Sequence, residues 1–352
     1  MLYEVYDEAL SRAEELRAKA FKEWVRKEDV LKKWRSYRAK AEDSIELKVC
    51  GVDGGRNFEE YRGFVVYVVD AEAVIYKGAE AEEPVKLCEI DILSPYRFVE
   101  ERVRTYGEIL EVKAALQALE RRNVNLALLD GSLISSLIKP LYAERRRGLQ
   151  GIDEFVKRLE AMNPWEANIL SKRLWEELKE TYGGEAGRAS SYLEGVEKLL
   201  LYKRLLSLHR DKLIFISKTS RGIDYFSSFK PDLAIFEHAS KTSGYSKPLE
   251  VMVGEKVKRR LPVDGAFFKS LRLTLFYARL EDGGPVLRFE VPRKLGEEEV
   301  ENLLNHLAIY SVAGYPYPLG KAHVDVEVEG AEIEKVVKML GVYRVEGVET
   351  YG

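Results

Sequence analysis

Residues 126–132 read Leu-Ala-Leu-Leu-Asp-Gly-Ser, and residues 49–55 read Val-Cys-Gly-Val-Asp-Gly-Gly. In each stretch a short β-like run ends in an aspartate that is followed at once by glycine. The run before Asp130 is apolar throughout, which is typical of a strand at the buried centre of a sheet. If the two strands are neighbours, Asp53 and Asp130 lie side by side at one edge of the sheet, where the sites of α/β proteins usually form.

The segments around these strands alternate between strand-like and helix-like patterns. β-branched and aromatic residues at 64–69 and 73–76 predict two strands joined as a hairpin through residues 70–72. Further strands are expected at 213–217, 271–280, 286–291 and 324–328, and helices at 96–122, 297–310 and 331–340. This order of elements predicts the α/β class, with a mixed central sheet flanked by helices.

Two long segments are helical in pattern and lie outside that core. Within residues 1–43, apolar side chains from Leu10 to Trp34 recur at three-, four- and seven-residue spacings. We therefore expect an N-terminal helical arm that packs on the body or on a second copy of the chain. Residues 132–210 are too long for a simple crossover and predict a helical lobe inserted into a domain that spans residues 44–352.

The composition is that of a globular protein and excludes several classes. Of the 352 residues, 46% are hydrophobic and 33% are charged, which excludes a disordered chain. Fifty-six basic residues against fifty-nine acidic ones give a formal net charge of −3, so a generally basic nucleic-acid coat protein is excluded and any polyanion must meet a local basic patch. With only Cys50 and Cys88, no secretory pattern and no apolar run near the roughly 20 residues of a membrane span, we expect a cytoplasmic protein with no membrane partner.

The two aspartates predict a metal site. Carboxylates a few ångströms apart repel, and each raises the pKa of the other unless a cation lies between them. A divalent ion is the simplest such cation, and hard oxygen ligands favour Mg²⁺ or Mn²⁺. Glu108 and Glu111 share one face of the helix that leads to Asp130, so one of them can reach the same ion. The alternatives stay open, because Asp-Gly is common turn chemistry and helix glutamates are usually solvated.

Two further side chains stand where an anion could be contacted. Lys218 follows the strand at 213–217 in Ser-Lys-Thr-Ser-Arg-Gly, where a compact positive charge suits a phosphate. His323 comes after Tyr-Pro-Tyr-Pro, a stiff and extended segment that could fix its approach to a site. A surface lysine and a structural histidine are the alternative interpretations.

Five motifs follow one another over about residues 45–330: Asp-Gly-Gly after the first strand, a helix glutamate, Leu-Leu-Asp-Gly-Ser, Ser-Lys-Thr-Ser, and Gly-Tyr-Pro-Tyr-Pro-Leu-x-x-Ala-His. In this order they resemble the motifs of the NurA-type nuclease family of archaea and some bacteria. The resemblance implies an RNase H-like core similar to the PIWI nuclease domain, a homodimer, and digestion of single- and double-stranded DNA with Mn²⁺, or with Mg²⁺. It also implies action with a HerA-type hexameric ATPase translocase, in resecting DNA ends for double-strand break repair.

The resemblance also implies metal ligands. Asp53 and Asp130 match the two metal-binding aspartates of the family. Glu111 matches the helix glutamate better than Glu108, because the family's spacing from this glutamate to the second aspartate is close to the nineteen residues from Glu111 to Asp130. With His323, which matches the C-terminal histidine, these side chains would hold one or two ions that activate water and stabilise the leaving oxygen.

Two more residues and two basic clusters complete the expected site. Lys218 matches the active-site lysine of the family and would neutralise the scissile phosphate, and Tyr315 matches its tyrosine and would position the DNA. The expected activity is that of a 5′–3′ exonuclease that also cuts single strands internally. The candidates for DNA backbone contacts are Arg145, Arg146, Arg147, Lys256, Lys258, Arg259 and Arg260, for which solvated surface is an equally good interpretation.

Two alternatives from other classes remain. Actin-like ATPases and sugar kinases also place Asp-Gly turns at strand ends around a metal nucleotide, but they need a second copy of the core, and none is evident in the sequence. A non-catalytic DNA-binding adaptor of a translocase would keep the fold and lose the carboxylate set, whereas this chain retains it.

Overall fold

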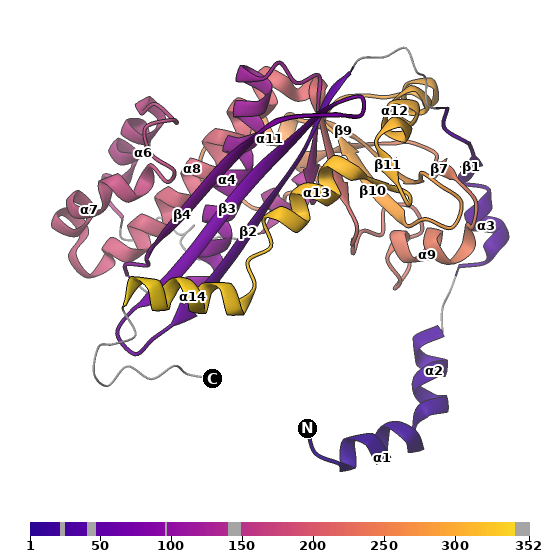
Figure 1. The fold of residues 1–352 in the computed structure, drawn as a ribbon, viewed down its shortest axis with the longest axis horizontal. Coiled ribbons are helices and arrows are strands. Elements are labelled where there is room, and N and C mark those ends of the chain that lie inside the picture. The colour runs from indigo at the N-terminus through magenta and orange to yellow at the C-terminus, as the bar shows by residue number, and fades with distance from the viewer. Residues whose placement is uncertain (22–24, 41–46, 96, 140–148, 342–352) are drawn as a thin grey trace.

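The computed structural model describes residues 1–21, 25–40, 47–95, 97–139 and 149–341. In them, one mixed sheet runs in the order β1-β7-β9-β10-β6-β5-β2-β3-β4, with β8 added on β9 (Figure 1). The strands are β1 (Trp34–Ser36), β2 (Lys48–Glu60), β3 (Val65–Lys77), β4 (Glu80–Ile92), β5 (Leu126–Asp130), β6 (Leu213–Ser217), β7 (Gly244–Ser246), β8 (Leu249–Met252), β9 (Arg272–Arg279) and β10 (Val286–Val291).

The centre of the sheet consists of three parallel strands. β2 pairs with β5, and β5 pairs with β6, all running in the same direction. Side chains alternate between the faces, so that Leu126 and Leu128 belong to one core cluster and Ala127 and Leu129 to the other. A strand buried on both faces must be apolar at every position, which explains the uninterrupted run before Asp130. The expected adjacency of the Asp53 and Asp130 strands is confirmed. The expected end of the first strand at Asp53 is wrong, because β2 continues to Glu60 through its pairing with β3.

Helices cover both faces of this sheet. α4 (Val99–Arg121) and α8 (Ala186–His209) pack on one face, with α9 (Asp232–Ala239) further along, and α12 (Glu297–Ile309) and α13 (Tyr317–Asp325) pack on the other. α14 (Gly330–Leu340) lies across β2 and β3 through Ile333 and Val337. No helix in the described part of the chain is long and apolar enough to span a bilayer. Smaller elements are α10 (Val253–Lys256), α11 (Gly265–Ser270), β11 (Ser311–Val312) and β12 (Tyr315–Pro316).

The segment 132–210 is mostly helical where it is described, with turns and bends at 162–170. It contains α5 (Leu133–Ile138), α6 (Ile152–Ala161), α7 (Trp175–Tyr182) and α8, with 3-10 turns at Ser171–Leu174 and Gly183–Glu185 and another at Arg210–Lys212. α6, α7 and the first half of α8 form a core of their own around Leu174 and Leu193. The second half of α8 packs into the main core through Leu199 and Leu205. α8 therefore links the lobe to the main core, and Lys172 adds ion pairs to Glu89 and Asp91 on β4.

The N-terminal segment differs from the helix expected over residues 1–43. It forms α1 (Glu4–Ser11), α2 (Ala13–Phe21) and α3 (Lys27–Leu31), and then β1, which pairs with β7. The side chain of Trp34 is buried against Phe236. The pairing of β1 with β7 and the contact between Trp34 and Phe236 outweigh the helical pattern of the local sequence, so Trp34–Ser36 forms a strand. The division into a helical arm and a nuclease domain stays a prediction.

Two other expectations are wrong. Residues 70–72 do not form a turn, because β3 runs without a break from Val65 to Lys77 and the hairpin turns at Gly78, where φ is +60°. Asp70 is accommodated inside the strand because its Oδ1 accepts a hydrogen bond from the Gly55 N–H at 3.0 Å. Residues 324–328 are not a strand, since α13 continues to Asp325 with proline in its first turn, where the fixed φ of proline favours a helix.

α13 lies directly on β2 because β2 carries glycine beneath it. A Cβ atom added at Gly51 would lie 2.2 Å from the backbone carbon of Pro318, a distance that no side chain tolerates. The absence of a side chain at this position allows the first turn of α13 to touch the strand. This contact fixes the helix that carries His323 beside the end of the central strands.

Candidate active site

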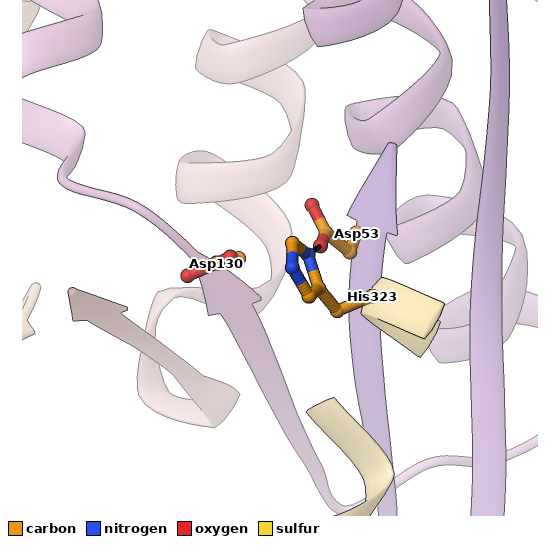
Figure 2. Close-up of side chains that lie close together, drawn as sticks. All are labelled: Asp53, Asp130 and His323. Carbon is orange, nitrogen blue, oxygen red and sulfur yellow. Dashed lines mark hydrogen bonds and ion pairs between the residues drawn. The ribbon is translucent and has the colours of Figure 1, made fainter. Parts of the chain in front are cut away.

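Asp53, Asp130 and His323 meet at one edge of the sheet. Asp53 lies on β2 and is 8% exposed, and Asp130 is the last residue of β5. His323 reaches them from α13, and its Nδ1 lies 2.7 Å from Asp53 Oδ2 (Figure 2). One ligand atom from each of the three residues lies within 4.8 Å of the others, close enough for them to share one ion.

Glu111 approaches the same place from α4. A Cβ atom added at Gly54 would lie 2.6 Å from Glu111 Cγ and 2.8 Å from its Oε1, so the carboxylate rests against the strand one residue after Asp53. Burial and the negative charges of Asp53, Glu108 and Asp130 raise the pKa of Glu111 to about 8, while Arg56 opposes the rise. Burial and the charge of Asp53 also raise the pKa of Asp130. These carboxylates therefore form an electrostatically unbalanced group.

Glu108 differs from Glu111 because a lysine side chain pairs with it. It is 6% exposed, and its Oε2 accepts a hydrogen bond from Lys198 Nζ at 2.9 Å. Lys198 is itself buried and comes from α8, ninety residues further along the chain. The charge of Glu108 is thus compensated, whereas no described lysine or arginine lies within ion-pair distance of Glu111.

Lys218 and Tyr315 lie on the other side of Asp130. Lys218 Nζ is 4.0 Å from Asp130 Oδ2 and 4.7 Å from the centre of the Tyr315 ring. The Tyr315 hydroxyl is buried and has no hydrogen-bond partner among the described residues. Burial and the charges of Asp130 and Asp53 raise the pKa of Tyr315, so its hydroxyl stays protonated and can donate a hydrogen bond.

A cleft of about 950 Å³ opens at this edge. Its lining includes Asp53, Asp130, His323 and Lys218 and continues along the loop after β6, Thr219 to Asp224. Sequence reasoning missed Arg288, which lines the cleft from β10 and is 7% exposed; its Nη1 donates to Ser220 Oγ at 3.2 Å, and its Nη2 lies 2.8 Å from Glu290 Oε1. The available signal was a pair of charged residues inside the otherwise apolar strand 286–291.

Of the two basic clusters expected to contact DNA, only the second lies within the described residues. Arg145, Arg146 and Arg147 lie outside the described residues. In the second cluster Lys256 lines the cleft and pairs with Asp224, whereas Lys258 and Arg260 are exposed away from its lining. Arg259 is half-buried and its Nε donates to the Leu137 carbonyl at 2.7 Å. Only Lys256 of this cluster is therefore placed to meet a ligand in the cleft.

The donor set fits a hard divalent cation. It offers carboxylate oxygens from three elements and one imidazole nitrogen, and within the described ranges Lys218 is the single lysine or arginine found at 4.0 Å from Asp53, Glu111 or Asp130. Carboxylates gathered this closely are usually neutralised by a metal ion or by protons. The raised pKa of Glu111 indicates that a proton takes this place when no ion is bound.

Comparisons with known proteins agree on one family. A family model described as "NurA domain" matches residues 47–328. A DNA double-strand break repair nuclease NurA from Sulfurisphaera tokodaii is 25% identical over 97% of this chain and 96% of its own length. A probable DNA double-strand break repair nuclease NurA from Methanocaldococcus jannaschii is 30% identical over 86% of this chain and 80% of its own length.

Solved structures share the fold. The crystal structure of the NurA nuclease from Sulfolobus solfataricus superposes with a TM-score of 0.76 at 22% identity, covering 100% of both chains. A crystal structure of NurA bound to dAMP and manganese gives a TM-score of 0.70 at 17% identity, covering 99% of this chain and 98% of the other. At these identities the likeness establishes a mixed α/β fold with a large sheet.

Replacing Gly54 with alanine should weaken metal binding. The new Cβ would overlap Glu111 Cγ, so the carboxylate must move away from Asp53. We expect Gly54→Ala to lower the affinity for Mn²⁺ by roughly tenfold or more, the loss typical of disturbed metal-site geometry, as measured by titration calorimetry. Gly63→Ala is the matched control, since nothing lies within 4 Å of a Cβ at that position. Equal affinities in the two variants would contradict the placement of Glu111.

The metal-free protein should lose stability as the pH rises towards 8. The pKa of Glu111 is raised from 4.5 to about 8, so its protonated form stabilises the folded state below 4.5 and this contribution is lost as the pH rises through 8. Asp70 and Asp232, whose pKa values are raised to about 6, change the stability of the folded state at lower pH than Glu111 does. Above about pH 6.5 we expect a decline of up to about 1.4 kcal/mol per pH unit.

Urea unfolding with a chelator present measures this decline. Glu111→Gln should flatten it, and Glu298→Gln, at an exposed position on α12, should not. A slope that is unchanged in Glu111→Gln would show that Glu111 already carries its charge in the folded protein.

Proposed function

The chain belongs to the NurA domain family, and on that premise we propose that it is a metal-dependent DNA nuclease acting in the repair of double-strand breaks. Relatives that match most of the chain carry this activity in their names. The observation that supports it most directly is the convergence of acidic side chains and a histidine from β2, β5, α4 and α13 at a cleft.

We propose that Asp53, Glu111, Asp130 and His323 hold one or two divalent ions. Mn²⁺ is favoured over Mg²⁺, because imidazole nitrogen is a softer ligand than oxygen and a related NurA crystal structure contains manganese. When bound, the ion supplies a Lewis acid for hydrolysis of the phosphodiester. The protein supplies rigid ligands, since both aspartates are on central strands and Glu111 is on a helix enclosed by the sheet and α8.

Lys218 and Tyr315 are proposed to act on the phosphate. The Lys218 ammonium stands beside Asp130 and can neutralise charge that grows on the non-bridging oxygens. The Tyr315 hydroxyl is a buried donor with no described partner, and a phosphate oxygen would satisfy it. Lys218 over the ring of Tyr315 keeps both groups on one side of the aspartates.

We further infer an RNase H-like, PIWI-related core. The strand order β4-β3-β2-β5-β6 supports this, since an antiparallel meander is followed by two strands parallel to β2. α4 connects β4 to β5, and the lobe with α8 connects β5 to β6. In this arrangement Asp130 ends β5, and Asp53 lies on β2 directly after the stretch that pairs with β5.

The partners are proposals drawn from the family. We propose that the chain digests DNA ends with 5′–3′ polarity, also cuts single strands internally, and works with a HerA-type hexameric ATPase. We also propose a homodimer. α1 supports an interaction of the arm with a second copy, because it projects from the body and has no buried residue, with Tyr6 54% and Leu10 76% exposed.

Replacing Asp130 with asparagine should abolish digestion of DNA. Asp130 is proposed as a ligand, and the reaction depends on charge stabilisation, so we expect Asp130→Asn to lower the rate by about 10²-fold or more. End-labelled linear DNA, incubated with Mn²⁺, Mg²⁺ or chelator, reports rate, metal preference and polarity together. Asp211→Asn, at an exposed position just before the opposite end of β6, should keep full activity.

Failure of the wild-type protein to digest DNA with either metal, while still binding it, would favour the adaptor alternative. Retained activity in Asp130→Asn would remove Asp130 from the metal site.

Introducing a charged side chain on the exposed face of α1 should dissociate the proposed dimer. Burying an apolar helix face drives association, and a carboxylate placed in that interface is costly to desolvate. We expect Leu10→Glu to shift the mass measured by light scattering from dimer to monomer. Leu208→Glu, at a 60% exposed position on α8, should leave the mass unchanged. A wild-type chain that is monomeric at all concentrations would contradict the homodimer.

A further inference from the structure

Three basic side chains surround the single carboxylate of Glu108. Lys198 Nζ donates a hydrogen bond to Oε2 at 2.9 Å. Arg104 Nε and Lys139 Nζ each lie 3.9 Å from Oε1, which is too far for a hydrogen bond. One of the three positive charges is compensated by Glu108, so the group carries an excess of positive charge.

The three cations differ in their access to solvent. Lys198 is only 2% exposed and is fully engaged with Glu108 and the Ser136 carbonyl. The side chain of Arg104 is 24% exposed and that of Lys139 is 46% exposed. Neither Arg104 nor Lys139 has a hydrogen-bond partner within the described part of the chain. The uncompensated charge therefore lies on the two side chains that a ligand can reach.

These cations lie beside the proposed metal site. Lys139, at the end of α5, lines the same cleft as Asp53, Asp130 and Lys218. Arg104, Glu108 and Glu111 are four and three residues apart on α4 and so follow one stripe of the helix. The charge of Glu108 is one cause of the raised pKa of Glu111, which confirms that the two carboxylates are near each other.

We propose that Arg104 and Lys139 form a phosphate subsite, which binds a backbone phosphate of the DNA strand next to the one that is cleaved. This inference rests on the proposed nuclease function and extends it to how the strand is held. A guanidinium and an ammonium group that face the same point suit a phosphodiester oxygen pair. No base edge is contacted, so the subsite holds DNA without regard to sequence.

Glu108 has a defined part in this arrangement. Both cations have the Glu108 carboxylate as their ion-pair partner. Glu108 holds Arg104 and Lys139 at 3.9 Å, near enough to orient them and loosely enough for a phosphate to replace it. Lys198 keeps Glu108 itself in place from α8. The subsite is thereby separated from the metal ligands on the same helix.

Binding of a fluorescent oligo-dT strand tests the subsite. Anisotropy is measured with a chelator present over a range of salt, using the full chain with Lys139→Gln, Arg104→Gln and both together. We expect each single variant to raise Kd by roughly tenfold, and the double variant to lower the salt slope by about one unit. With Mn²⁺, the KM for DNA should rise more than kcat falls. Mn²⁺ affinity without DNA should be unchanged.

Two further variants serve as controls. Lys139→Arg keeps the charge and should restore binding, which a folding defect at this position would not allow. Lys179→Gln changes a lysine of matched exposure, 47%, on α7 in the lobe and should leave Kd and slope unchanged.

The outcomes separate this inference from the proposed function. If the wild-type chain binds and digests DNA but the double variant keeps the same Kd and slope, the subsite is wrong and the nuclease stands. A higher Kd with an unchanged slope also overturns it, since that indicates lost packing in place of a phosphate contact. If the wild-type chain neither binds nor digests DNA, the nuclease and the subsite both fall.

Discussion

Mutual repulsion among carboxylates is the constraint that the rest of the molecule must withstand. Asp53, Glu111 and Asp130 come from two strands and a helix, and burial adds to the cost of holding their charges together. In a free chain these side chains would separate. They stay together because each is attached to an element fixed by packing elsewhere. Holding these charges together lowers the stability of the folded state, as is usual at sites that bind a cation or a charged substrate.

The compensation comes from the packing behind the site. α4 is buried on most sides because the sheet covers one flank and α8 covers another. Between these helices the ionic groups are matched in buried pairs, Arg102 with Glu194 and Glu108 with Lys198. Breaking a buried pair by removing one partner typically costs about 3–5 kcal/mol. These pairs fix the register of α4 against α8, and hence the height at which Glu111 meets β2.

A feature of the fold or site could be predicted from the sequence where the residues that determine it lie close together in the chain. The strands that carry Asp53 and Asp130 are set by apolar runs and could be inferred, as could Lys218 after the next strand, whereas the continuation of β2 to Glu60 depends on its pairing with β3. Residues 70–72 were misassigned because Asp70 finds its partner, the Gly55 N–H, only once β2 and β3 pair. The residues alone did not separate Glu108 from Glu111, which only the spacing in the resembling family favoured, since the lysine that distinguishes them lies ninety residues away on α8. Arg288 was missed because the loop that it faces in the cleft, with Ser220 and Asp224, lies more than sixty residues away in the sequence.

The formal net charge of −3 repels a polyanion such as DNA, so the chain must bind DNA through locally placed positive side chains. Along the cleft two cations are already paired closely with carboxylates, Lys256 with Asp224 and Arg288 with Glu290. Two cations of the lining remain only loosely paired, Lys218 beside Asp130 and Lys139 beside Glu108. A strand laid along the cleft meets these positive charges next to the acidic group. They bring a phosphate over ligands that would otherwise repel it, and they do so by contacts that every DNA sequence offers equally.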